Sequence, residues 1–169
     1  NRVKTAEDIL SAEASPLVVD LSYDTDLSVK QAIVASVIEA AWSKVKRDKA
    51  PANIIFVVDE AQNYAPQTWT ISKDAIETTV REGRKWGLSM VLASQRIVGD
   101  IDPSIRANLG TVFFSRLTAP TDLREISSYL DLADINESVL AQLQPREFFV
   151  AGLMNPLRKP VLIRTREVA

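Results

Sequence analysis

Short uninterrupted apolar runs alternate along the chain with apolar residues at helical spacing. The runs at 17–21, 54–58, 88–93 and 111–114 are rich in β-branched and aromatic residues and show no polar alternation. This pattern predicts strands buried on both faces, as in a parallel sheet. Two later runs, 148–153 and 160–164, predict closing strands joined by a turn at Asn155-Pro156.

Between these runs, apolar residues recur at the i, i+3, i+4 spacing of amphipathic helices. The clearest stripe covers residues 29–46, and the polar stretch 24–28 before it offers an N-cap. A second helix is predicted at 73–85, with Ser72 as N-cap and Gly87 as terminator. Shorter helices are predicted at 5–12, 104–108, 121–130 and 136–143. Strands that alternate with helices predict an α/β fold with a mostly parallel sheet flanked by helices.

Composition narrows the chemistry that the chain can perform. The 169 residues, 46% apolar and 25% charged, are sufficient for one globular domain with a sizeable core. Neither histidine nor cysteine occurs, which excludes Ser-His-Asp catalysis, thiol nucleophiles, disulfides and histidine- or thiolate-ligated metals. The net charge of −2 gives no global basic field for nucleic acid, although a local basic channel stays possible. No apolar run approaches the ~20 residues of a membrane span and no signal peptide is visible, so we expect a cytoplasmic protein.

Two carboxylates, Asp59 and Glu60, stand directly after the apolar run Ile54–Val58. Ligands of open α/β sheets bind beyond the carboxyl ends of the strands. The order of residues looks like a Walker B motif, in which Asp59 holds Mg²⁺ through water and Glu60 orients or deprotonates a water aimed at a γ-phosphate. The alternative is that Asp59 caps the turn and Glu60 is only solvated.

Further polar residues follow the other predicted strands. Gln95 stands where a nucleoside triphosphatase carries a sensor that contacts the attacking water and the γ-phosphate; the alternative is a loop glutamine bonded to backbone. Arg84 lies in a basic cluster bracketed by two glycines, and a guanidinium held there can act as an arginine finger on a neighbouring subunit. The alternative for Arg84 is a basic residue favoured by the helix dipole. Arg116, after the run at 111–114, is the rival finger and a candidate nucleotide contact.

The order of four segments resembles the second half of a HerA/FtsK-superfamily ATPase motor, with the HerA branch the nearest in pattern. The segments are IIFVVDEAQNYAP, REGRKWGLSMVLASQR, DIDPSI and TVFFSRL, and the similarity covers nearly all 169 residues, most weakly before Leu17. Gln62 departs from the pattern, because many HerA-like proteins carry His there; we expect little consequence, since the Asp-Glu pair is intact.

The resemblance implies a RecA-like P-loop NTPase core, with residues 1–169 as the C-terminal portion of a single domain. It implies ATP and Mg²⁺ as cofactors, Asp59 as the magnesium-associated acid and Glu60 as the catalytic glutamate. Gln95 would be the sensor and Arg84 the trans finger. Such motors form hexameric rings that translocate double-stranded DNA, and HerA proteins partner the NurA nuclease in DNA end processing. Loops 61–72 and 97–103 are the candidate pore loops, in which Tyr64 and Trp69 would stack on bases or pack the loop onto the domain.

None of the five glycines sits in a GxxxxGK[ST] phosphate-binding loop, so the Walker A half of the nucleotide site is absent from this chain. We expect the isolated chain to bind ATP weakly and to hydrolyse it negligibly. Three alternatives stay open: a conjugation or virus DNA-packaging ATPase of the same superfamily, a two-domain helicase suggested by the DEAQ tetrad, and a degenerate ATPase fold that serves as an interaction module. Against the helicase, the chain has no Ser-Ala-Thr motif after the next strand.

Overall fold

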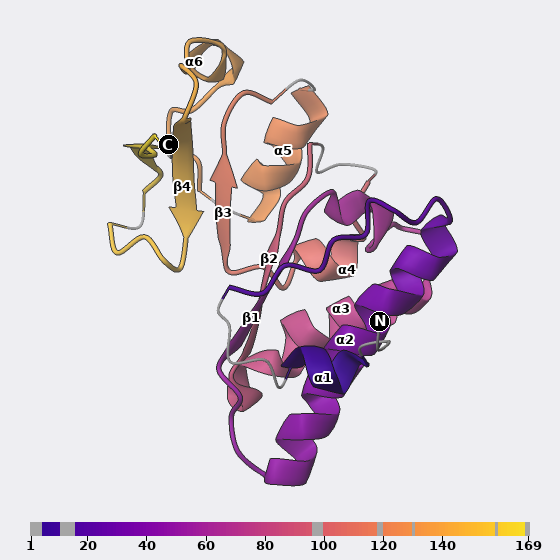
Figure 1. The fold of residues 1–169 in the computed structure, drawn as a ribbon. Coiled ribbons are helices and arrows are strands. Elements are labelled where there is room, and N and C mark those ends of the chain that lie inside the picture. The colour runs from indigo at the N-terminus through magenta and orange to yellow at the C-terminus, as the bar shows by residue number, and fades with distance from the viewer. Residues whose placement is uncertain are drawn as a thin grey trace. The chain divides into compact units, whose positions relative to one another are not determined.

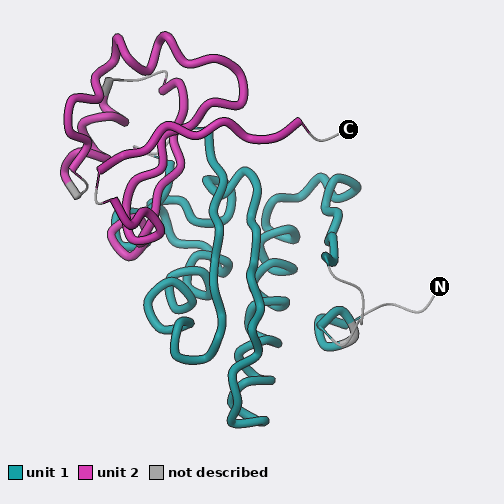
Figure 2. Tube along the Cα trace, turned by 90° about the vertical axis from the view of Figure 1, so that its left-hand side faces the viewer, with its two compact units in different colours: residues 1–95, 100–105 teal, residues 96–99, 106–169 magenta. Residues whose placement is uncertain are grey.

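The computed structural model describes residues 5–10, 16–95, 100–117, 120–129, 131–157 and 159–167. The chain divides into two compact units (Figure 2). Unit 1 contains residues 1–95 and 100–105, and unit 2 contains residues 96–99 and 106–169. The prediction that residues 1–169 form part of one RecA-like domain is not tested by this division.

Unit 1 is built on two parallel strands covered by helices. Strand β1 (Ile54–Val58) pairs in parallel with β2 (Leu88–Leu92), with Ile54 opposite Leu88. Helices α2 (Leu27–Asp48) and α3 (Ile71–Glu82) lie on one side of these strands, and the short α1 (Ala6–Leu10) contacts α2 (Figure 1). The α/β class, with a parallel sheet flanked by helices, is therefore confirmed.

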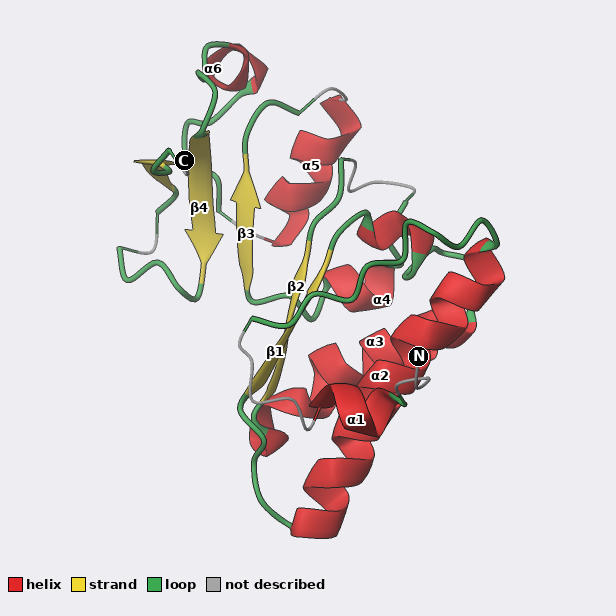
Figure 3. Ribbon diagram, viewed as in Figure 1, coloured by secondary structure: helices red, strands yellow, loops and turns green. Residues whose placement is uncertain are grey.

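One face of the β1–β2 sheet is not covered by other residues of the described chain. Burial alternates along β1, and Ile55 and Val57 are 66% and 71% exposed. The prediction that this strand is buried on both faces is wrong for the described chain, because α2 and α3 pack against one face only (Figure 3). The predicted strand at 17–21 is also wrong. This segment carries strand-forming residues, but Val18 is 81% exposed, and among the described residues no neighbouring strand supplies the hydrogen-bond ladder that a strand requires.

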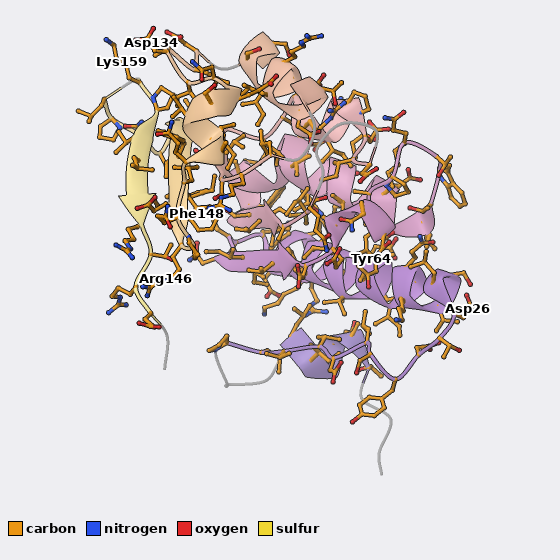
Figure 4. The ribbon with its side chains drawn as sticks, turned by 90° about the horizontal axis from the view of Figure 1, so that it is seen from above. Asp26, Tyr64, Asp134, Arg146, Phe148 and Lys159 are labelled. Carbon is orange, nitrogen blue, oxygen red and sulfur yellow. The ribbon has the colours of Figure 1, made fainter. Side chains whose placement is uncertain are left out.

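The helix boundaries follow from their caps. Asp26, labelled in Figure 4, accepts a hydrogen bond from the Ser28 N–H and starts α2, within the polar stretch expected to supply the cap. Thr70, not Ser72, caps α3; the Ser72 hydroxyl is buried and donates to the Tyr64 carbonyl at 2.6 Å. After α3, a 3₁₀ turn, η2 (Gly83–Trp86), ends at Gly87, whose φ of 67° lies in the left-handed region that favours glycine.

The core of unit 1 joins α2, α3 and the inner face of the sheet. It includes Ile38 and Val45 from α2, Ile76 from α3 and Leu88 from β2, none of them more than 1% exposed. A polar contact crosses this core: the Trp42 indole N–H donates to the Thr79 hydroxyl at 3.0 Å, and that hydroxyl donates to the Ala75 carbonyl. The Trp42 N–H and the Thr79 hydroxyl therefore both have hydrogen-bond partners in the core, where loss of a partner would lower the free energy of unfolding.

A largely buried ion pair joins the first turn of α3 to the segment 100–105. Lys73 pairs with Asp102, and their side chains are only 13% and 14% exposed. The Asp102 N–H also donates to the Ala65 carbonyl at 2.9 Å. Burial raises the pKa of Asp102, but hydrogen bonds from Lys73 and Ser104 outweigh this effect and lower the pKa to about 2.

Asp102→Asn is expected to lower the free energy of unfolding by about 2 kcal/mol at neutral pH. A pKa lowered from 3.8 to about 2 is equivalent to this energy at about 1.4 kcal/mol for each pH unit. Because the folded-state pKa is the lower one, the contribution is present above about pH 4 and is lost as the pH falls toward 2. Urea unfolding can be followed by tryptophan fluorescence, since Trp42, Trp69 and Trp86 all lie in unit 1.

The matched control is Asp48→Asn, which removes an exposed pair with Lys44 and should cost much less. An equal loss of stability at pH 7 and at pH 2 in Asp102→Asn would contradict the assignment, because it would show that the ionised carboxylate is not the stabilising species.

Unit 2 contains an antiparallel sheet in the order β3 (Thr111–Phe114), β4 (Glu147–Gly152) and β5 (Val161–Arg164). Helix α5 (Pro120–Tyr129) packs on it through Ile126, and Phe114 stacks on Phe149 with ring centroids 5.7 Å apart. The short helix α6 (Glu137–Ala141) begins at an Asn136 cap. The short helix α4 (Pro103–Arg106), which lies mostly in unit 1, precedes β3 in the sequence. At Gly152, a Cβ would lie 2.3 Å from the Gly110 carbonyl oxygen, so only glycine fits.

Candidate functional site

A sharp turn at the end of β1 presents the two acidic residues. Glu60 has φ 48° and ψ 46°, a left-handed conformation that is uncommon outside glycine. Its N–H donates to Asp59 Oδ1 at 2.9 Å, and the following Ala61 N–H donates to the Ala93 carbonyl beyond β2. The turn continues as a 3₁₀ segment, η1 (Ala61–Asn63). Backbone strain of this kind concentrates at functional sites.

Both oxygens of the Glu60 carboxylate are engaged by amides. Gln95, just beyond β2, donates from Nε2 to Glu60 Oε1 at 2.8 Å. Gln62, two residues after Glu60, donates from Nε2 to Oε2. The Ser94 hydroxyl donates to Gln62 Oε1 at 2.8 Å. The structure thus brings Glu60 and Gln95 together at the carboxyl ends of two adjacent parallel strands, as expected from the strand order.

Asp59 fits the binding of a nucleotide-bound magnesium ion rather than a metal caged by protein. The side chain is exposed, its Oδ1 is held by the Glu60 N–H, and Oδ2 carries no hydrogen bond within the described residues. Over the same residues, no group of three or more acidic side chains could surround a metal ion. Mg²⁺ commonly uses one or two carboxylates and completes its shell with water and substrate phosphates, which this donor set allows.

The two candidate arginines belong to different units of the chain. Arg84 is exposed in η2, before β2, whereas Gln95 follows β2. Arg84 therefore lies at the amino end of the parallel pair, at the opposite end of the strands from Glu60. Arg116 belongs to unit 2, where its Nε donates to the Leu143 carbonyl at 2.7 Å. Their proposed roles as finger or nucleotide contact are not tested by these positions.

The loop 61–72 is tied to the domain at several points. Tyr64, labelled in Figure 4, packs against the core of unit 1, and its carbonyl accepts from Thr70 and Ser72. Burial raises the pKa of the Tyr64 phenol. Trp69 is 72% exposed, although its indole N–H donates to Asp74 Oδ2 at 2.9 Å. Tyr64 therefore has a packing role, and Trp69 presents its ring to solvent. Of the other candidate pore loop, 97–103, residues 97–99 lie outside the described chain.

Sequence reasoning missed two members of the cluster. Gln62 was expected to have little consequence and Ser94 was not singled out, yet they form a hydrogen-bonded chain to Glu60. The available signal was spacing: Gln62 follows Glu60 by two residues in a turn, and Ser94 precedes Gln95 by one. Spacing alone could not show that the two turns lie side by side.

No helix in the described part of the chain is long and apolar enough to cross a membrane.

Comparisons with known proteins agree with this architecture. No protein-family model matches the chain. It is 26% identical over 113 residues to the Methanocaldococcus jannaschii protein named "Probable helicase MJ1565", and the match covers 66% of this chain and 21% of that protein. The chain thus spans about a fifth of the length of this curated relative.

Among solved structures, the chain is similar to the genome packaging NTPase B204 of Sulfolobus turreted icosahedral virus 2 in complex with AMPPCP. The TM-score is 0.69 at 19% identity, with 98% of this chain and 73% of that chain covered. The complex of the same NTPase with ATP-gammaS gives a TM-score of 0.65 at 20% identity, with 99% and 74% covered. The DNA-packaging ATPase B204 of Sulfolobus turreted icosahedral virus gives 0.63 at 18% identity, with 99% and 74% covered.

The chain has an α/β fold, with a parallel sheet flanked by helices, that is similar to the fold of RecA-like P-loop ATPases. The neighbours that share this fold are nucleotide-binding proteins crystallised with ATP analogues.

Proposed function

We propose that this chain carries the residues that hydrolyse ATP in a motor that moves double-stranded DNA. The observation that carries the proposal is the hydrogen bond from Gln95 to Glu60, 2.8 Å long, beyond the ends of β1 and β2. A carboxylate and an amide at adjacent strand ends match the base and sensor that ATP hydrolysis requires. The fold shared with a DNA-packaging ATPase and the 26% identity to the protein named "Probable helicase MJ1565" support the same assignment.

The chemistry follows from the residues in the turn. Glu60 accepts a proton from a water molecule while the oxygen of that water attacks the γ-phosphorus. The bond between this phosphorus and the bridging oxygen then breaks. Gln95 contacts Glu60 before the reaction, and its amide NH₂ group can also donate a hydrogen bond to the γ-phosphate. Asp59 would hold Mg²⁺ through water, and the ion would neutralise charge on the phosphates.

The complete site requires groups that these residues do not contain. The chain has no phosphate-binding loop motif, so the lysine and backbone N–H groups that hold phosphates would come from elsewhere in the whole protein. Arg84, exposed and remote from Glu60 along the strands, suits a finger that acts on a neighbouring subunit of a hexameric ring. Arg116 remains the rival.

Two specific roles are compatible with such a motor. The four ordered segments favour a HerA-type translocase that acts in DNA end processing with a NurA-like nuclease. The fold shared with the B204 NTPases favours genome packaging instead. The two are distinguished by adding a purified NurA-like nuclease, which should stimulate hydrolysis only in the first case.

The test is ATP hydrolysis by the whole protein with and without duplex DNA. We expect turnover that duplex DNA stimulates and that requires Mg²⁺. Absence of turnover under both conditions, in a protein shown to be folded, would overturn the motor assignment and favour an interaction module built on an ATPase fold.

A further inference from the structure

We propose that Gln62 is a positioning residue for Glu60, and that Ser94 sets the direction in which the Gln62 amide faces. The inference rests on the proposed role of Glu60 as the base and adds a device that holds this base. It assigns a role to the position that departs from the HerA pattern.

The first argument is the occupancy of the carboxylate. Gln62 Nε2 donates to Oε2 of Glu60, and Gln95 Nε2 donates to Oε1. Each carboxylate oxygen has two lone pairs, so it can still accept a hydrogen bond from the attacking water while an amide is bound. The two amides therefore hold the carboxylate in place and leave acceptor sites for the water.

The second argument compares how firmly the two amides are held. Gln62 belongs to the same tight turn as Glu60, which is closed by hydrogen bonds from the Asn63 N–H to the Glu60 carbonyl and from the Ala61 N–H to the Ala93 carbonyl. A further bond joins the Gln31 side chain to the Asn63 carbonyl at 2.7 Å. Gln95, by contrast, reaches Glu60 from the next strand. The Gln62 amide is therefore held beside Glu60 by the turn. The Gln95 amide can instead exchange its hydrogen bond to Glu60 for one to a phosphate.

The third argument concerns the direction of the Gln62 amide. An amide can face Glu60 with its NH₂ group, which attracts the carboxylate, or with its oxygen, which repels it. The Ser94 hydroxyl donates to Gln62 Oε1 at 2.8 Å, so the oxygen is engaged and the NH₂ group is turned to Glu60. Ser94 immediately precedes Gln95, and both amide contacts of Glu60 therefore depend on one short segment after β2.

The kinetic test is a double-mutant cycle in the whole protein. Gln62→Leu is expected to lower kcat about ten- to hundredfold with little change in KM, because a small misplacement of a catalytic group costs rate rather than binding. Ser94→Ala should lower kcat in the wild-type background, have no further effect beside Gln62→Leu, and be rescued by Ser94→Thr. Additive effects of the two substitutions would show that Ser94 does not act through Gln62. Gln142→Leu, at an exposed glutamine outside both candidate pore loops, is the matched control.

A second test does not depend on hydrolysis. In the 169-residue chain, the side-chain amide resonance of Gln62 should shift in Glu60→Ala and in Ser94→Ala, while the Gln67 amide resonance stays unchanged. An unshifted Gln62 resonance would overturn the positioning role even if the motor is active. A shifted resonance in a protein without ATPase activity would instead support the positioning of Glu60 by Gln62 and contradict the proposed function.

Discussion

Glu60→Gln is expected to reduce ATP turnover by the whole protein about 10²- to 10⁴-fold, the usual contribution of a general base. The amide has nearly the same shape as the carboxylate and keeps one acceptor oxygen for Gln95, but it cannot take the proton of the attacking water. The loss should therefore appear in kcat, while the affinity for a non-hydrolysable ATP analogue is retained. The measurement is steady-state hydrolysis with duplex DNA, together with direct binding of the analogue.

Glu39→Gln is the matched control, because it makes the same chemical change on the exposed surface of α2. It should leave kcat at the wild-type value. If Glu60→Gln retained full turnover, Glu60 would not be the base, and Asp59, Gln95 and Gln62 would lose their proposed roles with it. If Glu60→Gln also lost nucleotide binding, the turn would be structural rather than catalytic.

Ile76→Ala is expected to give the largest loss of stability, about 2–5 kcal/mol. Ile76 is fully buried on α3, within the cluster that joins α2 and α3 to the inner face of β1 and β2. Truncation removes three carbon atoms from this core and leaves a cavity that the packed helices cannot fill completely. Urea unfolding followed by tryptophan fluorescence measures the effect, because the three tryptophans report on unit 1 alone.

Ile71→Ala supplies the comparison on the same helix, since Ile71 is 44% exposed at the first turn of α3. It should lower the free energy of unfolding by well below half as much as Ile76→Ala does. Equal losses for the two substitutions would mean that the described core does not carry the stability of unit 1, and that the packing of α3 on α2 is weaker than the structure indicates.

Local patterns determined the elements of this fold. The stripe at 29–46 predicted α2, and the apolar runs predicted β1, β2 and β3. Gly87, predicted to terminate the helix at 73–85, instead ends the 3₁₀ turn η2, because α3 itself ends at Glu82. These features depend on side-chain spacing and on the conformational freedom of single residues, which neighbours in the sequence decide. The carboxylates after β1 and the glutamine after β2 were also visible as strand-end residues.

Tertiary structure decided which elements pair and which faces are covered. The run at 17–21 has the composition of a strand but no partner in the described chain, and β1 has helices on one face only. The closing strand β4 pairs antiparallel with β3, and β5 pairs antiparallel with β4, a choice that apolar patterning does not reveal.

The candidate site divides in the same way. Asp59, Glu60 and Gln95 could be predicted as strand-end residues from the sequence, because each comes soon after an apolar run. Tertiary structure alone brought Ser94 against Gln62 and Gln95 against Glu60, since these contacts join residues separated by 32 and 35 positions. Hydrogen bonds of that kind depend on the distance and angle between two turns, and no spacing within either turn specifies them.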